Sequence, residues 1–198
     1  MKKDTNKKII IGFSIGDYNG IGPEILLKSF SDSKLLQNFI PVVFCDKHIL
    51  EYYSKRYGHE FKIKETNNLD SITDDNSIYT FPISNTEIEI LPGEIKKESG
   101  NYAVKSLEEC TNAQINKKID GIVTLPISKI NSQSTKFPFP GHTEYFLEKF
   151  NIDSIIDMPC GDVLWIKNTI LEKKIKYLGI DIVDELIFKN NKIYKNNH

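Results

Sequence analysis

The chain has 198 residues, which is enough for one domain or two small ones. Its 26 Lys and Arg residues balance 27 Asp and Glu residues, and the formal net charge is −1. This balance argues against a nucleic-acid binder held by a basic face and against a polybasic membrane-surface protein. The hydrophobic fraction of 39% and the charged fraction of 27% are typical of a globular protein, which excludes wholesale disorder.

Apolar runs and cysteines indicate the compartment. The longest apolar run, residues 9–13, is far shorter than the roughly 20 residues that a membrane helix needs. No long apolar run follows the basic N-terminus, which predicts no signal peptide. The three cysteines, Cys45, Cys110 and Cys160, lie far apart and form no CxxC pair, which favours a reducing cytosol. We therefore expect a cytoplasmic protein without membrane or nucleic-acid partners.

The first quarter of the chain alternates two kinds of element. The apolar, β-branched residues 8–14 predict a buried strand. Pro23 suits the first turn of a helix, which we expect to run to about residue 36. Residues 40–45 predict a second buried strand, and residues 46–57 a second helix. This order favours an α/β fold with mostly parallel strands.

The middle of the chain continues the same pattern. The polar residues 65–77 predict a surface connection, and residues 78–81 and 87–91 predict two further strands. Apolar groups recur at intervals of three and four within residues 101–117, which is typical of a helix packed by one side on a sheet. Residues 120–125 predict another buried strand.

The last third of the chain begins with a rigid loop. Residues 137–142 (FPFPGH) predict this loop, and residues 143–150 predict a helix. The pattern then restarts with a strand at residues 154–158, a helix, a strand at residues 176–180, and a final helix from about residue 183. We expect a short β-α-β-α fragment to close the chain.

The first candidate site is the glycine-rich loop at residues 16–24. Asp17, Asn19 and Glu24 gather there, between the end of a strand and the start of a helix, where α/β proteins bind ligands. The glycine spacing lacks the third small residue of a dinucleotide-binding fingerprint. In the plainer alternative, the glycines only turn the chain into the helix.

The second candidate site is the turn at residues 139–144. Pro140 and Gly141 fix the backbone, so His142 and Thr143 are presented from a stiff turn at the start of a helix. Backbone N–H groups, a hydroxyl and an imidazole together suit a phosphate or a carboxylate. The alternative is that Thr143 is a simple N-cap and His142 a surface residue.

The third candidate is Lys129, which follows a predicted strand in the block TLPISK, residues 124–129. Its cation suits an anionic substrate, although an isolated exposed lysine commonly has no specific role. No two histidines have the i,i+4 spacing of metal ligands, and the sequence has neither a GxSxG elbow nor a Walker loop. We expect no metal ligands in this chain.

Three blocks together resemble one family. They are IIGFSIGDYNGIGPE at residues 10–24, VTLPISK at residues 123–129 and FPGHTE at residues 139–144. In this order they resemble the 4-hydroxythreonine-4-phosphate dehydrogenases, NAD-dependent enzymes of vitamin B6 (pyridoxal 5'-phosphate) biosynthesis. The GIGPE loop is similar to that of isopropylmalate and isocitrate dehydrogenases, so the combination of blocks carries the resemblance. It covers about residues 7–150.

The resemblance implies an isopropylmalate-dehydrogenase-like α/β fold, a homodimer, and a small phosphorylated hydroxy-amino acid as substrate. The implied reaction oxidises the secondary alcohol of 4-phosphohydroxy-L-threonine by hydride transfer to NAD, after which carbon dioxide is lost. A divalent metal would polarise the alcohol oxygen. The resemblance implies that His142 and Thr143 contact the substrate. Asp17 and Lys129 lie in matching blocks and are possible substrate-site residues, and no catalytic residue is assigned.

The resemblance also implies that this chain lacks a C-terminal part of the family's sequence. Family chains continue further and carry three metal-binding histidines in that continuation, whereas only His198 follows His142 here. We therefore expect residues 1–150 to be a partial, truncated dehydrogenase-like domain with impaired activity. A non-catalytic remnant that binds a phosphorylated ligand or a partner subunit is the alternative.

The remaining residues, 151–198, resemble the start of a class I S-adenosylmethionine-dependent methyltransferase. The block SIIDMPCGD, residues 154–162, is similar to the first motif of that family, and KYLGID, residues 176–181, to its second strand. The resemblance implies that Asp181 accepts the ribose hydroxyls of the cofactor. This segment is too short for a complete methyltransferase, so a methyltransferase fragment is a further alternative.

Overall fold

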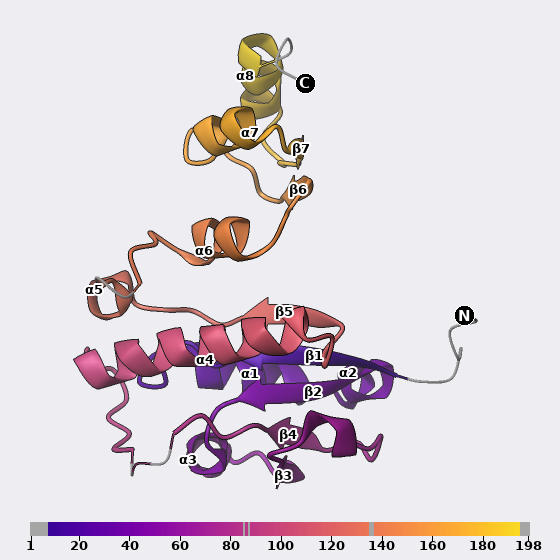
Figure 1. Cartoon of the computed structure of the whole chain (residues 1–198), viewed down its shortest axis with the longest axis vertical. Helices are drawn as coiled ribbons and strands as arrows, with labels where there is room; N and C mark the ends of the chain where they lie inside the picture. The colour runs from indigo at the N-terminus through magenta and orange to yellow at the C-terminus, as the bar shows by residue number, and fades with distance from the viewer. Residues whose placement is uncertain (1–7, 85, 87, 135–136, 195–198) are drawn as a thin grey trace. The chain divides into compact units, whose positions relative to one another are not determined.

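A computed structural model describes residues 8–84, 86, 88–134 and 137–194. It divides the chain into two compact units, residues 1–142 and residues 143–198, each of which builds its own sheet (Figure 1). The division falls eight residues before residue 150, where the sequence predicts the seam. No helix within the described ranges is both long enough and apolar enough to cross a membrane.

The N-terminal unit is built on a five-stranded sheet in the order β3-β4-β2-β1-β5. All neighbouring strands are parallel, which confirms the α/β fold with a mostly parallel sheet. The isopropylmalate-dehydrogenase-like detail stays a prediction. The strands are β1 (Ile9–Ser14), β2 (Phe39–Phe44), β3 (Ile63–Glu65), β4 (Ile78–Thr80) and β5 (Gly121–Thr124).

Helices cover both faces of this sheet, as parallel strands require. Helix α4 lies over one face, and α1 and α3 lie over the other (Figure 1). On β1, Phe13 packs against Phe30 of α1 with ring centroids 5.4 Å apart. Gly12 faces the other way, and a Cβ there would lie 2.9 Å from the Cys110 sulfur of α4. The helices are α1 (Gly22–Phe30), α2 (Ser33–Asn38), α3 (Lys47–Tyr57), α4 (Lys97–Ile115) and α5 (Lys129–Ser132).

Two predicted elements differ from the structure near the N-terminus. The helix expected to reach residue 36 breaks after Phe30, because the Asp32 side chain accepts a hydrogen bond from the Lys34 N–H at 3.0 Å and caps a second helix, α2. The polar segment 65–77 is expected to be only a connection, but its first residue ends the edge strand β3.

The strand predicted at residues 87–91 is wrong over its described part. Residues 88–91 have no regular structure, and residue 87 lies outside the described residues. The N–H of Leu91 donates to the Asn19 side-chain oxygen at 2.8 Å instead of to a neighbouring strand. Alternation of Glu and Ile in this segment therefore does not mark a strand.

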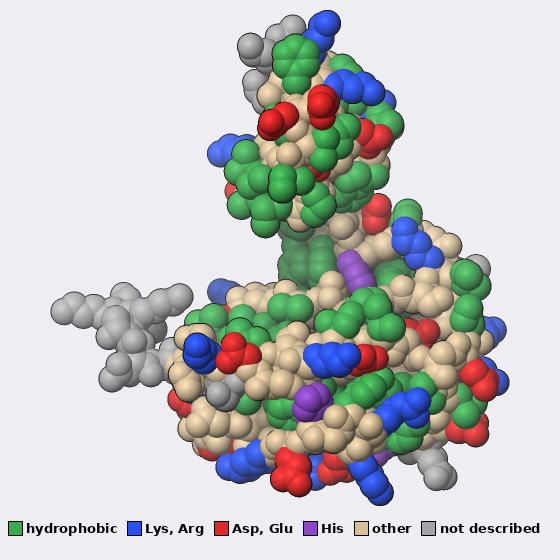
Figure 2. Space-filling view, turned by 180° about the vertical axis from the view of Figure 1, so that it is seen from behind, with side chains coloured by type: hydrophobic (Ala, Val, Ile, Leu, Met, Phe, Trp, Pro, Cys, Tyr) green, Lys and Arg blue, Asp and Glu red, His purple; other side chains and the backbone are tan. Residues whose placement is uncertain are grey.

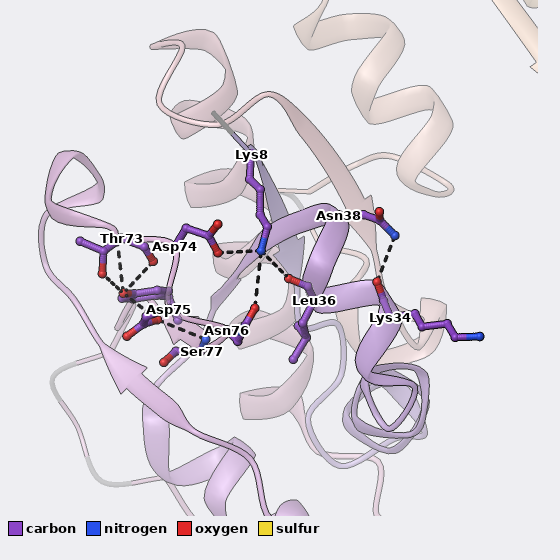
Figure 3. A network of polar contacts seen from close by, with 10 residues as sticks. Lys8, Lys34, Leu36, Asn38, Thr73, Asp74, Asp75, Asn76 and Ser77 are labelled. Carbon is purple, nitrogen blue, oxygen red and sulfur yellow. Dashed lines mark hydrogen bonds and ion pairs between the residues drawn. The ribbon is translucent and has the colours of Figure 1, made fainter. Parts of the chain in front are cut away.

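A polar network ties together segments at the amino end of the sheet (Figure 3). The Lys8 ammonium donates to the Leu36 carbonyl at 3.1 Å, to Asp74 Oδ1 at 2.7 Å and to Asn76 Oδ1 at 3.5 Å. These bonds join the residue before β1 to α2 and to the loop before β4. The network stabilises the end of the sheet opposite the candidate site.

The C-terminal unit has a separate two-stranded parallel sheet. Its elements follow the predicted β-α-β-α order, and its small core consists of Cys160, Val163, Ile166 and Ile170. The elements are α6 (His142–Lys149), whose first residue still belongs to the N-terminal unit, β6 (Ser154–Asp157), α7 (Lys167–Lys173), β7 (Lys176–Gly179) and α8 (Asp184–Tyr194).

Large hydrophobic side chains are exposed on the C-terminal unit, and they appear in the upper part of Figure 2. Ile156 and Leu178 are paired across β6 and β7 and are 71% and 55% exposed. Their neighbours Ile155 and Tyr177 pack instead on the small core. One face of this sheet is therefore covered by its own helices, and the other carries exposed apolar side chains.

Candidate functional site

Two loops meet at the carboxyl end of the five-stranded sheet. The loop between β1 and α1 contacts the segment after β5, because the Asp17 N–H donates to the Pro126 carbonyl at 3.0 Å. Gly16 has a φ of +70°, and a Cβ at this position would overlap the Pro126 oxygen. Glycine is therefore required for this close approach. Ligands of open α/β sheets bind at this end of the strands.

Asp17 is only 5% exposed, and both of its carboxylate oxygens accept hydrogen bonds. Oδ1 accepts from the Asn19 N–H at 2.9 Å, and Oδ2 accepts from the Asn131 side-chain amide at 2.8 Å. The carboxylate thus fixes its own loop and links that loop to helix α5.

Asn131 connects this loop to a third element, the start of α4. Its side-chain amide also donates to the Lys96 carbonyl at 2.9 Å and lies 3.3 Å from Ser99 Oγ. A Cβ at Gly100 would overlap the Asn131 carbonyl oxygen, so the two helices touch through their backbones. Lys129, the first residue of α5, is exposed and lies two residues before this junction.

Asn19 holds a further segment in place. It is 3% exposed, its side-chain oxygen accepts from the Leu91 N–H at 2.8 Å, and its carbonyl accepts from the Gly93 N–H at 2.7 Å. Sequence reasoning singled out Asn19 but missed the turn that it binds, and it missed Asn131 altogether. Both partners lie far from the loop in sequence, and no local pattern marks them.

Glu24, also singled out in this loop, points elsewhere. Its carboxylate accepts a hydrogen bond from the Tyr57 hydroxyl at 2.8 Å and pairs with Lys28 at 2.5 Å. The Tyr57 hydrogen bond joins α1 to α3, whereas the Lys28 pair lies within α1. Glu24 therefore belongs to helix packing and not to the junction around Asp17.

His142 and Thr143 are the first two residues of α6. Because the helix begins at His142, Thr143 lies inside the first turn and past the N-cap position. Glu144 follows in the same turn. The division between the two units falls between His142 and Thr143.

Asp181 follows strand β7 and binds two backbone groups. Its Oδ2 accepts from the Gly161 N–H at 2.9 Å, and its Oδ1 accepts from the Val183 N–H at 3.0 Å. These hydrogen bonds, first that from Val183 and then that from Gly161, lower the pKa of Asp181. The Asn190 side chain donates to the Gly161 carbonyl at 2.8 Å. In this structure Asp181 ties together the turns after β6 and β7.

The described residues do not fit the divalent metal that the family resemblance implies. Across these ranges, no three His, Cys, Asp or Glu side chains come together as possible metal ligands. The three cysteines are buried free thiols, and burial raises the pKa of each. We assign neither metal binding nor a nucleophilic role to them.

Comparison with known proteins places the chain among one group of enzymes. The family model described as "Pyridoxal phosphate biosynthetic protein PdxA" matches residues 37–182. A 4-hydroxythreonine-4-phosphate dehydrogenase of Bacteroides thetaiotaomicron is 33% identical over 142 residues, which are 72% of this chain and 39% of that protein. The corresponding Hydrogenobaculum protein is 30% identical over 188 residues, 94% of this chain and 58% of that protein. The chain thus spans 39% and 58% of these two curated relatives.

Solved structures are similar in fold. A 4-hydroxythreonine-4-phosphate dehydrogenase from Burkholderia phymatum matches with a TM-score of 0.67 and 24% identity, covering 73% of this chain and 44% of that chain. The Klebsiella pneumoniae enzyme matches with a TM-score of 0.62 and 22% identity, covering 74% of this chain and 44% of that chain. At these identities the likeness supports the fold alone.

The same comparisons bear on the last part of the chain. The match to the family model continues to residue 182, so it includes both blocks, 154–162 and 176–181, on which the methyltransferase resemblance rests. That resemblance receives no support. Both blocks lie within the region that the PdxA family model matches.

Proposed function

This chain belongs to the PdxA family of pyridoxal phosphate biosynthetic proteins, and on that premise we propose that the whole protein oxidises 4-phosphohydroxy-L-threonine with NAD. The name of its relatives, 4-hydroxythreonine-4-phosphate dehydrogenase, supports this substrate and reaction class. Loss of carbon dioxide after the oxidation, a divalent metal, a homodimer and a cytoplasmic location belong to the same proposal. Because the described residues offer no metal site, no step is assigned to a metal here.

The observation that carries the proposal is the family match over residues 37–182. We assign roles to individual residues from the charge and hydrogen-bonding capacity of their side chains. We assign substrate contact to the His142 imidazole and the Thr143 hydroxyl, and attraction of an anionic group to the exposed Lys129 ammonium. Asp17 is a positioning residue, since its carboxylate holds Asn131 two residues after Lys129.

Binding of the substrate to the purified chain tests these roles. The midpoint of thermal unfolding should rise with 4-phosphohydroxy-L-threonine, and a ligand at 100 times its Kd adds about 2.7 kcal/mol of stability. Lys129→Gln and His142→Asn should weaken binding. Lys105→Gln and His48→Asn change exposed residues of the same types on α4 and α3 and serve as matched controls. No shift, or an equal shift in variants and controls, contradicts the assignment.

Formation of NADH separates the enzyme from its alternative. We expect little or no turnover by this chain alone, and robust turnover would overturn the expected impairment. Substrate-induced stabilisation without turnover, even with added divalent metal, would favour a non-catalytic protein that binds a phosphorylated ligand or a partner subunit. Sedimentation with and without the substrate tests the homodimer.

A further inference from the structure

A largely exposed segment, residues 91–96, leads into helix α4 and is called the strap below. It begins with a β-turn in which the Glu94 N–H donates to the Leu91 carbonyl at 3.0 Å. Pro92 and Gly93 occupy the two central positions, and Gly93 has a φ of +88°. Proline followed by a residue of positive φ is typical of a type II turn. The strap thus starts with a rigid turn whose conformation depends on glycine.

Asn19 holds this turn to the loop after β1. Its side-chain oxygen accepts from the Leu91 N–H at 2.8 Å, and its carbonyl accepts from the Gly93 N–H at 2.7 Å. Residues 92–96 are all exposed, and among the described residues no atom lies within 4 Å of a Cβ placed at Gly93. A segment that buries so few side chains opens locally more readily than the core. We therefore expect the two bonds to Asn19 to set how tightly the turn is held.

Asn131 contacts the other end of the strap. Its side-chain amide donates to the Lys96 carbonyl at 2.9 Å and to Asp17 Oδ2 at 2.8 Å. Asp17 Oδ1 accepts from the Asn19 N–H at 2.9 Å, so one carboxylate binds both asparagines. Asn131 belongs to α5, the short helix that begins with Lys129. The strap and the helix that carries Lys129 are therefore attached to the same buried carboxylate.

The two ends of the strap differ in how firmly they are held. The Lys96 carbonyl also accepts from the Gly100 N–H at 3.2 Å, which fixes this end to the start of α4. The turn end is held by Asn19, and a cavity of about 380 Å³ lies beside it, lined in part by Leu91 and Tyr18. The turn can therefore move beside open space while Lys96 serves as the hinge.

We propose that the strap opens and closes together with α5, and that Asn19 and Asn131 are the positioning residues that couple them through Asp17. Opening of the turn loosens the hold on Asn19, and through the Asp17 carboxylate it also loosens Asn131. Because coupling between two sites is reciprocal, a substrate that binds Lys129 also closes the strap. That last step alone rests on the proposed function.

Hydrogen exchange of individual amides in Gly93→Ala tests the coupling. Alanine is strained at a φ of +88°, so exchange of the Leu91 N–H should become about fivefold faster. Exchange of the Ser132 N–H, which donates to the Ser128 carbonyl of α5 at 3.0 Å, should rise by about twofold or more. Gly58→Ala is the matched control after α3: its φ is +68°, its surroundings within the described part of the chain are equally open, and both amides should be unaffected.

Substrate binding provides a second measurement. In the unmodified chain, 4-phosphohydroxy-L-threonine should slow exchange of the Leu91 N–H. Gly93→Ala should raise the Kd of the substrate by about twofold or more, whereas Gly58→Ala should leave it unchanged. If the substrate does not raise the midpoint of thermal unfolding, the proposed function is contradicted, and exchange in Gly93→Ala still decides the coupling.

Three results would overturn the proposal: unchanged exchange of Ser132 in Gly93→Ala, an equal rise in Gly58→Ala, or bound substrate that leaves the exchange of Leu91 unchanged. Val42, a fully buried residue of β2, monitors the fold of the whole unit. Its exchange should stay the same in Gly93→Ala. A rise at Val42 equal to that at Ser132 would mean that the unit opens as a whole, and it would also contradict the coupling.

Discussion

The side-chain amide of Asn131 lies 2.8 Å from Oδ2 of Asp17, although 114 residues separate the two in the sequence. Through this one bond the loop after β1 is joined to the helix after β5. Because the acceptor is a buried carboxylate, the bond is stronger than one between neutral groups. The ends of two adjacent parallel strands are thereby fixed where the proposed substrate site begins.

Asp17→Ala should lower the free energy of unfolding of the N-terminal unit by about 3 kcal/mol, since it removes a charged acceptor and leaves the Asn19 N–H and the Asn131 amide unsatisfied. Urea unfolding measures the change. Asp70→Ala is the matched control: it removes a surface ion pair with Lys118 and should change stability by less than about 1 kcal/mol.

A double-mutant cycle with Asn131→Ala isolates the bond itself. The losses of the two single variants should not add, because each removes the same contact. Additive losses would show that Asp17 acts through its own loop alone.

Much of the sheet could be predicted from sequence, whereas the junction could not. The strands β1 and β2 are runs of apolar residues, because both faces of a parallel sheet are buried. The contacts of Asp17 and Asn19 depend on Asn131 and Leu91, which no local pattern connects to them. Residues 88–91 alternate as a strand would, but Asn19 takes up the Leu91 N–H. Long-range hydrogen bonds thus overrode the local pattern.

Gly100→Ala should destabilise the protein although it lies inside helix α4. Alanine normally stabilises a helix interior by about 0.5–1 kcal/mol relative to glycine. Here the new Cβ would overlap the Asn131 carbonyl oxygen, which is backbone and cannot rotate away. The free energy of unfolding should therefore fall. An increase in the free energy of unfolding would show that α4 and α5 can move apart without destabilising the protein.

Gly20→Ala is the control for that variant. A Cβ at Gly20 would lie 3.3 Å from its nearest neighbour, the Asp17 carbonyl oxygen, so only a small adjustment is needed. Its effect on stability should be clearly smaller than that of Gly100→Ala.

Tyr102→Phe should lower the free energy of unfolding by about 1–3 kcal/mol, the usual cost of leaving a buried polar group unsatisfied. The Tyr102 hydroxyl donates to Asp46 Oδ2 at 2.6 Å and accepts from the Asp46 N–H at 2.8 Å, which links α4 to the start of α3. Urea unfolding measures the loss. Tyr52→Phe, at an exposed tyrosine of α3, should have little effect, and equal losses would contradict the role given to the Tyr102 hydroxyl.

The polar network of Figure 3 should make stability depend on acid pH through Asp75. Burial opposes ionisation of this carboxyl, but hydrogen bonds from Lys64, Ser77 and Lys62 outweigh it and hold the pKa of Asp75 well below its ordinary value of 3.8. A depressed folded-state pKa means that this stabilisation is complete above the unfolded value. It is lost as the pH falls through the folded value.

Asp75→Asn should therefore lower stability at neutral pH and flatten the decline in the free energy of unfolding below about pH 4. Urea unfolding at a series of pH values measures both effects. Lys64→Met should also flatten the decline in the free energy of unfolding at acid pH, because it removes one of the donors that favour the Asp75 carboxylate. In the Asp75→Asn background it should add little, since the two residues act through one contact. If the free energy of unfolding of Asp75→Asn falls as steeply at acid pH as that of the unmodified chain, a group other than Asp75 causes the pH dependence.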